Sequence, residues 1–123
     1  MKIIHFFAVI IVLTTTACGQ FCSKEGYFRI VNPTLDKWYD AVEVADHSSK
    51  ITMGSSIAEL QSILREYKDI DVPECYSDAH LFVMAYMDRS ITCYFWFVEG
   101  RSTVERCFNY ADMFFDYAMD ELP

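Results

Sequence analysis

The longest stretch with a single hydrophobic period runs from Pro73 to Glu99. Wound as a helix at about 100° per residue, it gathers its apolar and weakly polar side chains on one broad face. The residues on that face are Cys75, Tyr76, Ala79, Val83, Tyr86, Met87, Cys93, Tyr94 and Phe97. The run 91–98 favours a strand by propensity alone, but it continues the helical face without a break. The pattern therefore predicts one long core-facing helix, which Gly100 ends.

Three further segments place apolar residues at helical spacing. The first covers residues 33–46, and its proline suits the first turn of a helix. The motif S-x-x-E at Ser56 and again at Ser102 forms a capping box, which predicts where the second and fourth helices begin. Because short connections make neighbouring helices antiparallel, we predict an all-α fold. It is an antiparallel, up-down four-helix bundle that occupies residues 33–123 as a single domain.

The N-terminal residues 1–17 have the features of a signal peptide, namely one lysine, a short apolar run and small residues before Cys18. The apolar run is too short to span a bilayer as a helix. Since Thr-Thr-Ala-Cys resembles the lipobox of bacterial lipoproteins, we expect Cys18 to be acylated and to anchor the chain to the membrane. Ordinary cleavage after Ala17 or Gly19, which would secrete the protein, stays open. Residues 18–32 show neither the helical nor the strand spacing of apolar residues, and they are predicted to form an irregular tether.

Length and charge narrow the possible functions. A chain of 123 residues that is 53% hydrophobic can build one domain with a core. The formal net charge is −8, and such a surface repels phosphate backbones and anionic lipid headgroups. We therefore expect no nucleic-acid binding and no electrostatic docking to membranes.

Five cysteines in a small exported protein are typical of disulfides, with Cys18 left over. Cys75 and Cys93 stand 18 residues apart on one helix, hence about 27 Å, whereas a disulfide needs α-carbons within about 7 Å. In a hairpin that turns at the glycine after that helix, Cys107 lies level with Cys93 and far from Cys75. The remaining pairs, Cys93 with Cys107 and Cys22 with Cys75, are the prediction; a Cys18–Cys22 link is a weaker alternative.

Few residues suggest catalytic chemistry. His47 and His80 lie outside any E-x-x-H or H-E-x-x-H motif, and the chain has no C-x-x-C, G-x-S-x-G or P-loop. We therefore expect no enzymatic activity and no metal or other cofactor. Asp112, Asp116 and Asp120 repeat at four-residue intervals; we interpret them as a solvated acidic face in preference to a surface for a cation or basic partner.

Large apolar side chains occupy more than one side of the last two helices. Phe95, Trp96, Phe114 and Phe115 are the clearest cases, since one interface rarely needs so many. Core filling explains them most simply. Alternatively, they form a surface for a protein partner or a second copy, or they line a pocket for a small apolar ligand.

The chain carries the segments Ile57-Ala-Glu-Leu-Gln61, Val72-Pro-Glu-Cys75 and Tyr86-Met-Asp88. With this IAELQ…VPxC…YMD pattern, the chain resembles small uncharacterised exported bacterial helical proteins, many of them lipoproteins, and the likeness covers residues 38–122. The resemblance implies export and an all-helical fold, and no activity. The sequence thus favours a helical binding module of the cell envelope, lipid-anchored or secreted. The alternative is a carrier of a small apolar ligand in an aromatic-lined bundle core.

Overall fold

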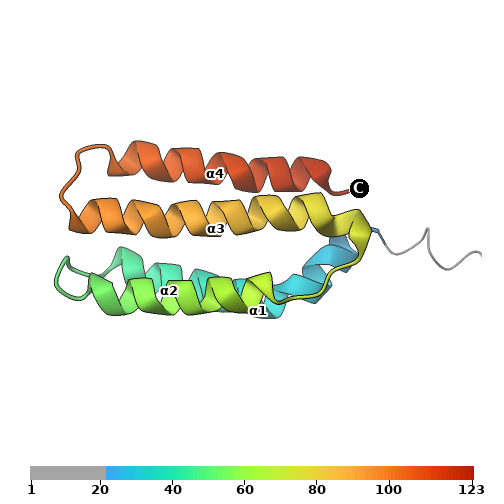
Figure 1. Cartoon of the computed structure of the whole chain (residues 1–123), viewed down its shortest axis with the longest axis horizontal. Helices are drawn as coiled ribbons and strands as arrows, with labels where there is room; N and C mark the ends of the chain where they lie inside the picture. The colour runs from blue at the N-terminus through green and yellow to red at the C-terminus, as the bar shows by residue number, and fades with distance from the viewer. Residues whose placement is uncertain (1–21) are drawn as a thin grey trace, which may run out of the picture.

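A computed structural model describes residues 22–123, and it contains four α-helices and no strand within that range. The helices are α1 (Lys24–Asp46), α2 (Met53–Lys68), α3 (Ser77–Val98) and α4 (Val104–Glu121), with a short 3-10 turn, η1 (Glu74–Tyr76), before α3. Two hairpins form two layers, α1 with α2 and α3 with α4 (Figure 1). The predicted all-α four-helix bundle is confirmed. The predicted signal peptide and Cys18 lie outside the described residues.

The start of α1 corrects the predicted tether. The helix begins at Lys24 rather than at residue 33, because the Ser23 side chain caps it by accepting a hydrogen bond from the Gly26 amide at 3.0 Å. Tyr27 and Val31 are fully buried and continue the apolar stripe of α1 back by two turns. Pro33 therefore lies inside the helix, where it lacks an amide proton to donate. Residues 24–32 belong to the bundle.

The predicted capping box at Ser56 is also wrong. The second helix α2 begins earlier, at Met53, which is buried, and its N-cap Thr52 makes no side-chain capping bond. Ser56 is buried and shares a hydrogen bond of 3.0 Å with Ser48 in the loop that precedes α2. Burial of Met53 thus extends the helix by a turn that the capping motif did not indicate.

A glycine turn joins α3 to α4, as the sequence predicted. Gly100 has a positive φ of 74°, its amide bonds to the Phe97 carbonyl, and the Arg101 amide bonds to the Trp96 carbonyl, each at 3.0 Å. These two bonds form a Schellman motif, which favours glycine in the left-handed region. The next helix starts at Val104 after Thr103, which makes no side-chain capping bond, so the predicted capping box at Ser102 is wrong.

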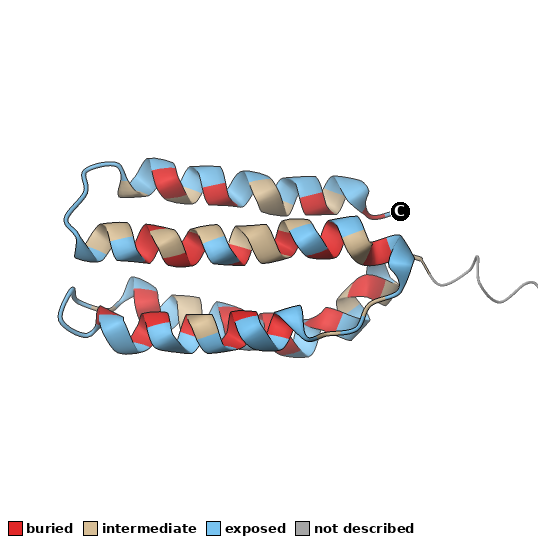
Figure 2. Cartoon of the chain, in the orientation of Figure 1, coloured by how far each residue is buried: buried red, intermediate tan, exposed pale blue. Residues whose placement is uncertain are grey.

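The core lies between the two layers, where buried residues alternate with exposed ones along each helix (Figure 2). A chain of ring contacts crosses it: Trp38 of α1 lies 6.2 Å from Tyr86 of α3, which lies 5.4 Å from Phe115 of α4.

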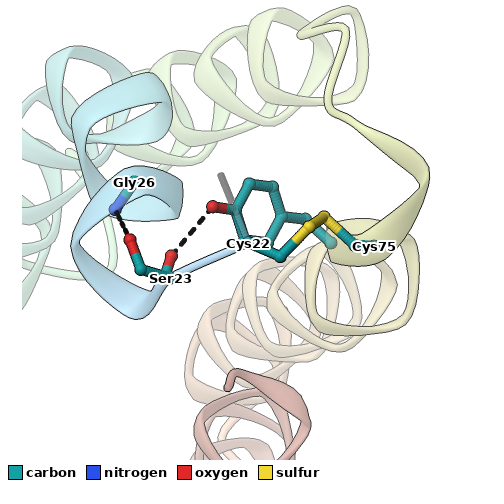
Figure 3. Close-up of a disulfide and its surroundings, with 5 residues drawn as sticks. Cys22, Ser23, Gly26 and Cys75 are labelled. Atoms are coloured by element: carbon teal, nitrogen blue, oxygen red, sulfur yellow. Dashed lines mark hydrogen bonds between the residues drawn. A yellow bond between two sulfur atoms is a disulfide. The ribbon is translucent and has the colours of Figure 1, made fainter. Parts of the chain in front are cut away.

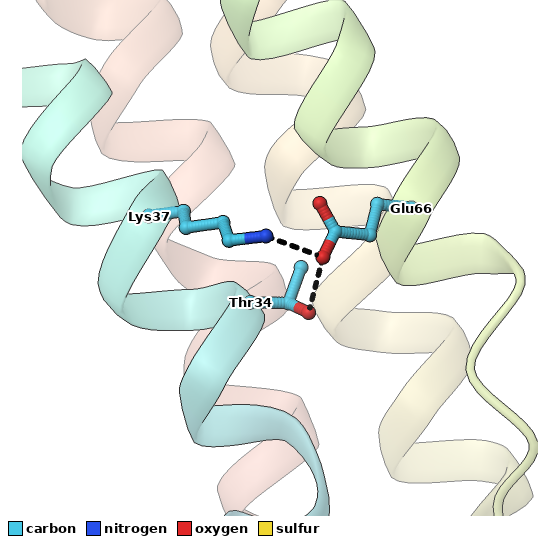
Figure 4. Close-up of polar contacts among 3 residues, drawn as sticks. All are labelled: Thr34, Lys37 and Glu66. Atoms are coloured by element: carbon cyan, nitrogen blue, oxygen red, sulfur yellow. Dashed lines mark hydrogen bonds and ion pairs between the residues drawn. The ribbon is translucent and has the colours of Figure 1, made fainter.

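At the surface, Lys37 of α1 and Glu66 of α2 form an ion pair at 2.8 Å, and Thr34 donates a long hydrogen bond to the same carboxylate (Figure 4). Exposed pairs of this kind contribute little to stability.

Two disulfides join the predicted cysteine pairs. Cys22 bonds to Cys75 with α-carbons 6.1 Å apart, and Cys93 bonds to Cys107 with α-carbons 5.6 Å apart. The first ties the start of α1 to η1 (Figure 3), and beside it the Tyr76 hydroxyl donates to the Ser23 carbonyl at 2.9 Å. The second joins α3 to α4. Both predicted pairings are confirmed, and the Cys18–Cys22 alternative is wrong.

Among residues 22–123, no helix combines the length and the apolarity needed to cross a lipid bilayer.

Candidate functional site

The large side chains of α4 lie on two flanks because the residues between them are small. Cys107, Ala111 and Ala118 are buried against the rest of the bundle, and small residues let α3 and α4 approach closely. Large rings at neighbouring positions therefore lie on either side of the contact between α3 and α4. We call the side that faces the core the inner flank and the side that faces solvent the outer flank.

Phe115 belongs to the inner flank. It packs against the core and its ring lies 5.4 Å from that of Tyr86. Phe108 lies seven residues earlier, on the same side of α4, and its ring centre is 5.0 Å from that of Tyr94. Of the four residues considered for a partner or ligand surface, Phe115 is therefore placed as a core residue.

The outer flank carries a continuous row of aromatic contacts, which we call the outer strip and define as Phe82, Arg89, Tyr110, Phe114 and Tyr117. The Phe82 ring lies 5.8 Å from Tyr117, Tyr117 lies 6.5 Å from Phe114, and Phe114 lies 5.4 Å from Tyr110. The guanidinium of Arg89 covers the Tyr110 ring at 5.1 Å. Tyr110 and Tyr117 are 47% and 44% exposed. Phe114 thus belongs to a ladder of rings that spans both helices and faces solvent.

Trp96 extends the same side of α3. Phe82, Arg89 and Trp96 follow one another at intervals of seven residues, so they share one side of the helix. The guanidinium of Arg101 lies 4.7 Å from the centre of the Trp96 ring, next to the Schellman turn. Phe95 is 43% exposed, but it points about 100° away around the helix. The structure thus brings Trp96 and Phe114 onto one flank and separates Phe95 from them.

A buried polar cluster, which the sequence did not indicate, lies at the opposite end of the bundle from the Gly100 turn. The hydroxyls of Tyr27 and Tyr67 form a short hydrogen bond, and the Tyr27 hydroxyl also lies 3.3 Å from Nδ1 of His80. The Tyr67 and His80 rings stack with centroids 4.4 Å apart. Three different helices contribute these residues, so sequence spacing carries no signal for the cluster.

Burial disfavours the charged form of all three side chains in this cluster. It raises the pKa of Tyr27 to about 12, although the bond with Tyr67 offsets part of the effect. Burial, together with the neighbouring Tyr27, also raises the pKa of Tyr67. For His80, burial lowers the pKa, and an interaction with the Tyr67 backbone offsets part of this effect. The Nε2 atom of His80 has no hydrogen-bond partner of normal geometry among the described residues. Neutral, enclosed side chains of this kind suit packing and specificity better than nucleophilic chemistry.

The acidic row on α4 remains exposed. Burial, followed by repulsion from Asp116, raises the pKa of Asp112 above its ordinary value. Residues 22–123 contain no group of three or more histidine, cysteine, aspartate or glutamate side chains placed to hold a metal ion.

The clearest depressions on the described surface are shallow and do not involve the outer strip. One is bounded by the C-terminal end of α1 and the loop after it, including His47 and Thr52. The other lies along the start of α1, around Phe28 and Arg29. The aromatic residues of α3 and α4 thus contribute to neither depression.

Comparison with protein-family models, with curated protein sequences and with solved structures finds no match for this chain. The resemblance to exported helical proteins stays a prediction. The outer strip therefore has to be interpreted from its own chemistry.

Proposed function

We propose that this chain is a non-enzymatic helical interaction module of the cell envelope, lipid-anchored or secreted, which binds a protein through the outer strip. The observation that supports this best is the unbroken series of ring contacts from Phe82 to Tyr110, with Arg89 at its end. Tyrosine and arginine are enriched at protein interfaces, where rigid rings bury area with little loss of conformational entropy. The two disulfides are compatible with an exported protein.

The outer strip differs from scattered surface hydrophobics. Single exposed apolar side chains are normal on a soluble protein, and Ile51, at 95% exposed in a loop, is one of them. Tyr110, Phe114 and Tyr117 instead stand at positions i, i+4 and i+7 of α4, and they meet Phe82 from α3. A helix or sheet edge of a partner protein can pack along this row of side chains and contact successive rings.

Site-specific photo-crosslinking in cells tests this function. A photoreactive phenylalanine analogue at Tyr117 should yield a discrete crosslinked protein band. The same analogue at Tyr39 of α1, which is 46% exposed, is the matched control and should give none. Phe114→Ser should weaken the band at position 117 several-fold. Equal labelling at both positions, or none at Tyr117, would count against binding through the outer strip.

Carriage of a small apolar ligand is the alternative. It has less support, because the aromatic side chains facing the core contact one another from Trp38 through Tyr86 to Phe115. Native mass spectrometry of the purified protein distinguishes the two functions. Lipid or another apolar molecule bound in stoichiometric amount would favour the carrier.

A further inference from the structure

We infer that the protein bound by the outer strip is a second copy of this chain, docked with α4 antiparallel to α4 of the partner about a two-fold axis near residues 113–114. This inference rests on the proposed function, since it names the partner of the same surface. The charge pattern along α4 is the observation that selects this partner and this orientation.

On the side of α4 that carries Tyr110 and Tyr117, the side chains are self-complementary when the helix is reversed. In a two-fold interface, residue i of one copy contacts residue j of the other, and residue j contacts residue i in return. When the two copies of one helix run antiparallel, the numbers of the paired residues therefore add up to a constant. An axis between Met113 and Phe114 pairs Tyr110 with Tyr117 of the other copy, ring against ring. The same axis pairs Arg106 with Glu121 at both ends of the contact. Aromatic groups occupy the centre and opposite charges the rim, as in protein interfaces generally.

The side chains concerned are available for such a contact. Tyr110, Met113 and Tyr117 are 47%, 43% and 44% exposed, and Arg106 and Glu121 are exposed as well. The ion pairs found within residues 22–123 are Lys37 with Glu66 and Arg101 with Glu99. Neither Arg106 nor Glu121 therefore has an ionic partner within this described range.

Charge also disfavours the parallel arrangement. If α4 met a parallel copy of itself, Arg106 would face Arg106, and the acidic C-terminal end would face an identical acidic end. The chain already carries a formal net charge of −8, and like charges placed together across an interface are costly. The antiparallel register replaces both repulsive contacts with attractive ones.

Charge reversal tests the register. The photoreactive analogue at Met113, next to the axis, should crosslink the full chain expressed in cells to a product of twice its mass. Arg106→Glu alone and Glu121→Arg alone should each reduce this product by at least tenfold, because each places like charges together. The double variant, which exchanges the two charges, should restore it. Arg29→Glu on the exposed surface of α1 is the matched control and should leave the product unchanged.

The outcomes separate the two proposals. A crosslinked band of a different mass, insensitive to the Arg106 and Glu121 changes, would overturn self-association and leave the proposed function standing. A dimer band that survives both single reversals would overturn the antiparallel register. No band at Met113 or Tyr117 would overturn both proposals. Circular dichroism of each variant, expected to match wild type because the altered residues are exposed, excludes unfolding as the cause of a lost band.

Discussion

Removal of the disulfide between Cys22 and Cys75 is expected to lower the free energy of unfolding by about 4 kcal/mol. The bond joins residues separated by 53 positions, and restricting an unfolded chain by a loop of this length gives about 4 kcal/mol at 25 °C. Cys75 is exposed and Cys22 is half-buried, so replacing both with serine leaves no large cavity and encloses no hydroxyl. The loss is a large share of the roughly 5–15 kcal/mol that stabilises a typical domain.

Urea unfolding followed by circular dichroism measures this effect, with wild type compared to Cys22→Ser, Cys75→Ser. The reference is Cys93→Ala, Cys107→Ala, whose bond spans 14 positions and should contribute about 3 kcal/mol by the same relation, plus the lost packing of two buried sulfurs. Mild reductant should open the bond at exposed Cys75 first, since Cys93 and Cys107 are 0% and 5% exposed. A double serine variant within about 1 kcal/mol of wild type would refute the loop argument.

Three further predictions follow from single residues. Asp116→Asn should stabilise the protein by about 0.2–0.5 kcal/mol, because it relieves like-charge repulsion along α4. It should also lower the pKa of Asp112 in carboxylate NMR titrations. If the variant were less stable, and calcium stabilised the wild type, the row would instead be a cation site. Because burial lowers the pKa of His80, the unfolded chain binds more protons in acid, so the free energy of unfolding should fall as pH drops below about 6.5. His80→Phe should flatten that part of the pH profile in urea titrations; an unchanged profile would assign the pH dependence to other groups. Cys18→Ser should abolish lipid labelling and move the protein to the soluble fraction, and persistent membrane association would contradict acylation.

The presence of four helices and the exclusion of the wrong disulfide pairs could be predicted from sequence, because both depend on geometry within one helix or one hairpin. Apolar spacing marks α3 and α4 whatever they pack against, and Gly100 supplies the left-handed residue that ends α3. A predicted helix over residues 73–99 also fixes the distance between cysteines along it, which is why Cys75 could be excluded as a partner of Cys93 without any tertiary information. The structure begins α3 at Ser77 and places Cys75 in the preceding turn η1.

Tertiary packing decided the role of each aromatic side chain, and together with the local Ser23 cap it decided the start of α1. Pro33 resembles a helix start, but burial of Tyr27 and Val31 continues the helix through it. Neighbours in sequence such as Phe114 and Phe115 differ by about 100° around α4, and only the position of α3 determines which one enters the core. His80 meets Tyr27 and Tyr67 across two helix interfaces. Such contacts depend on how whole helices pack, because the residues that form them are distant in sequence.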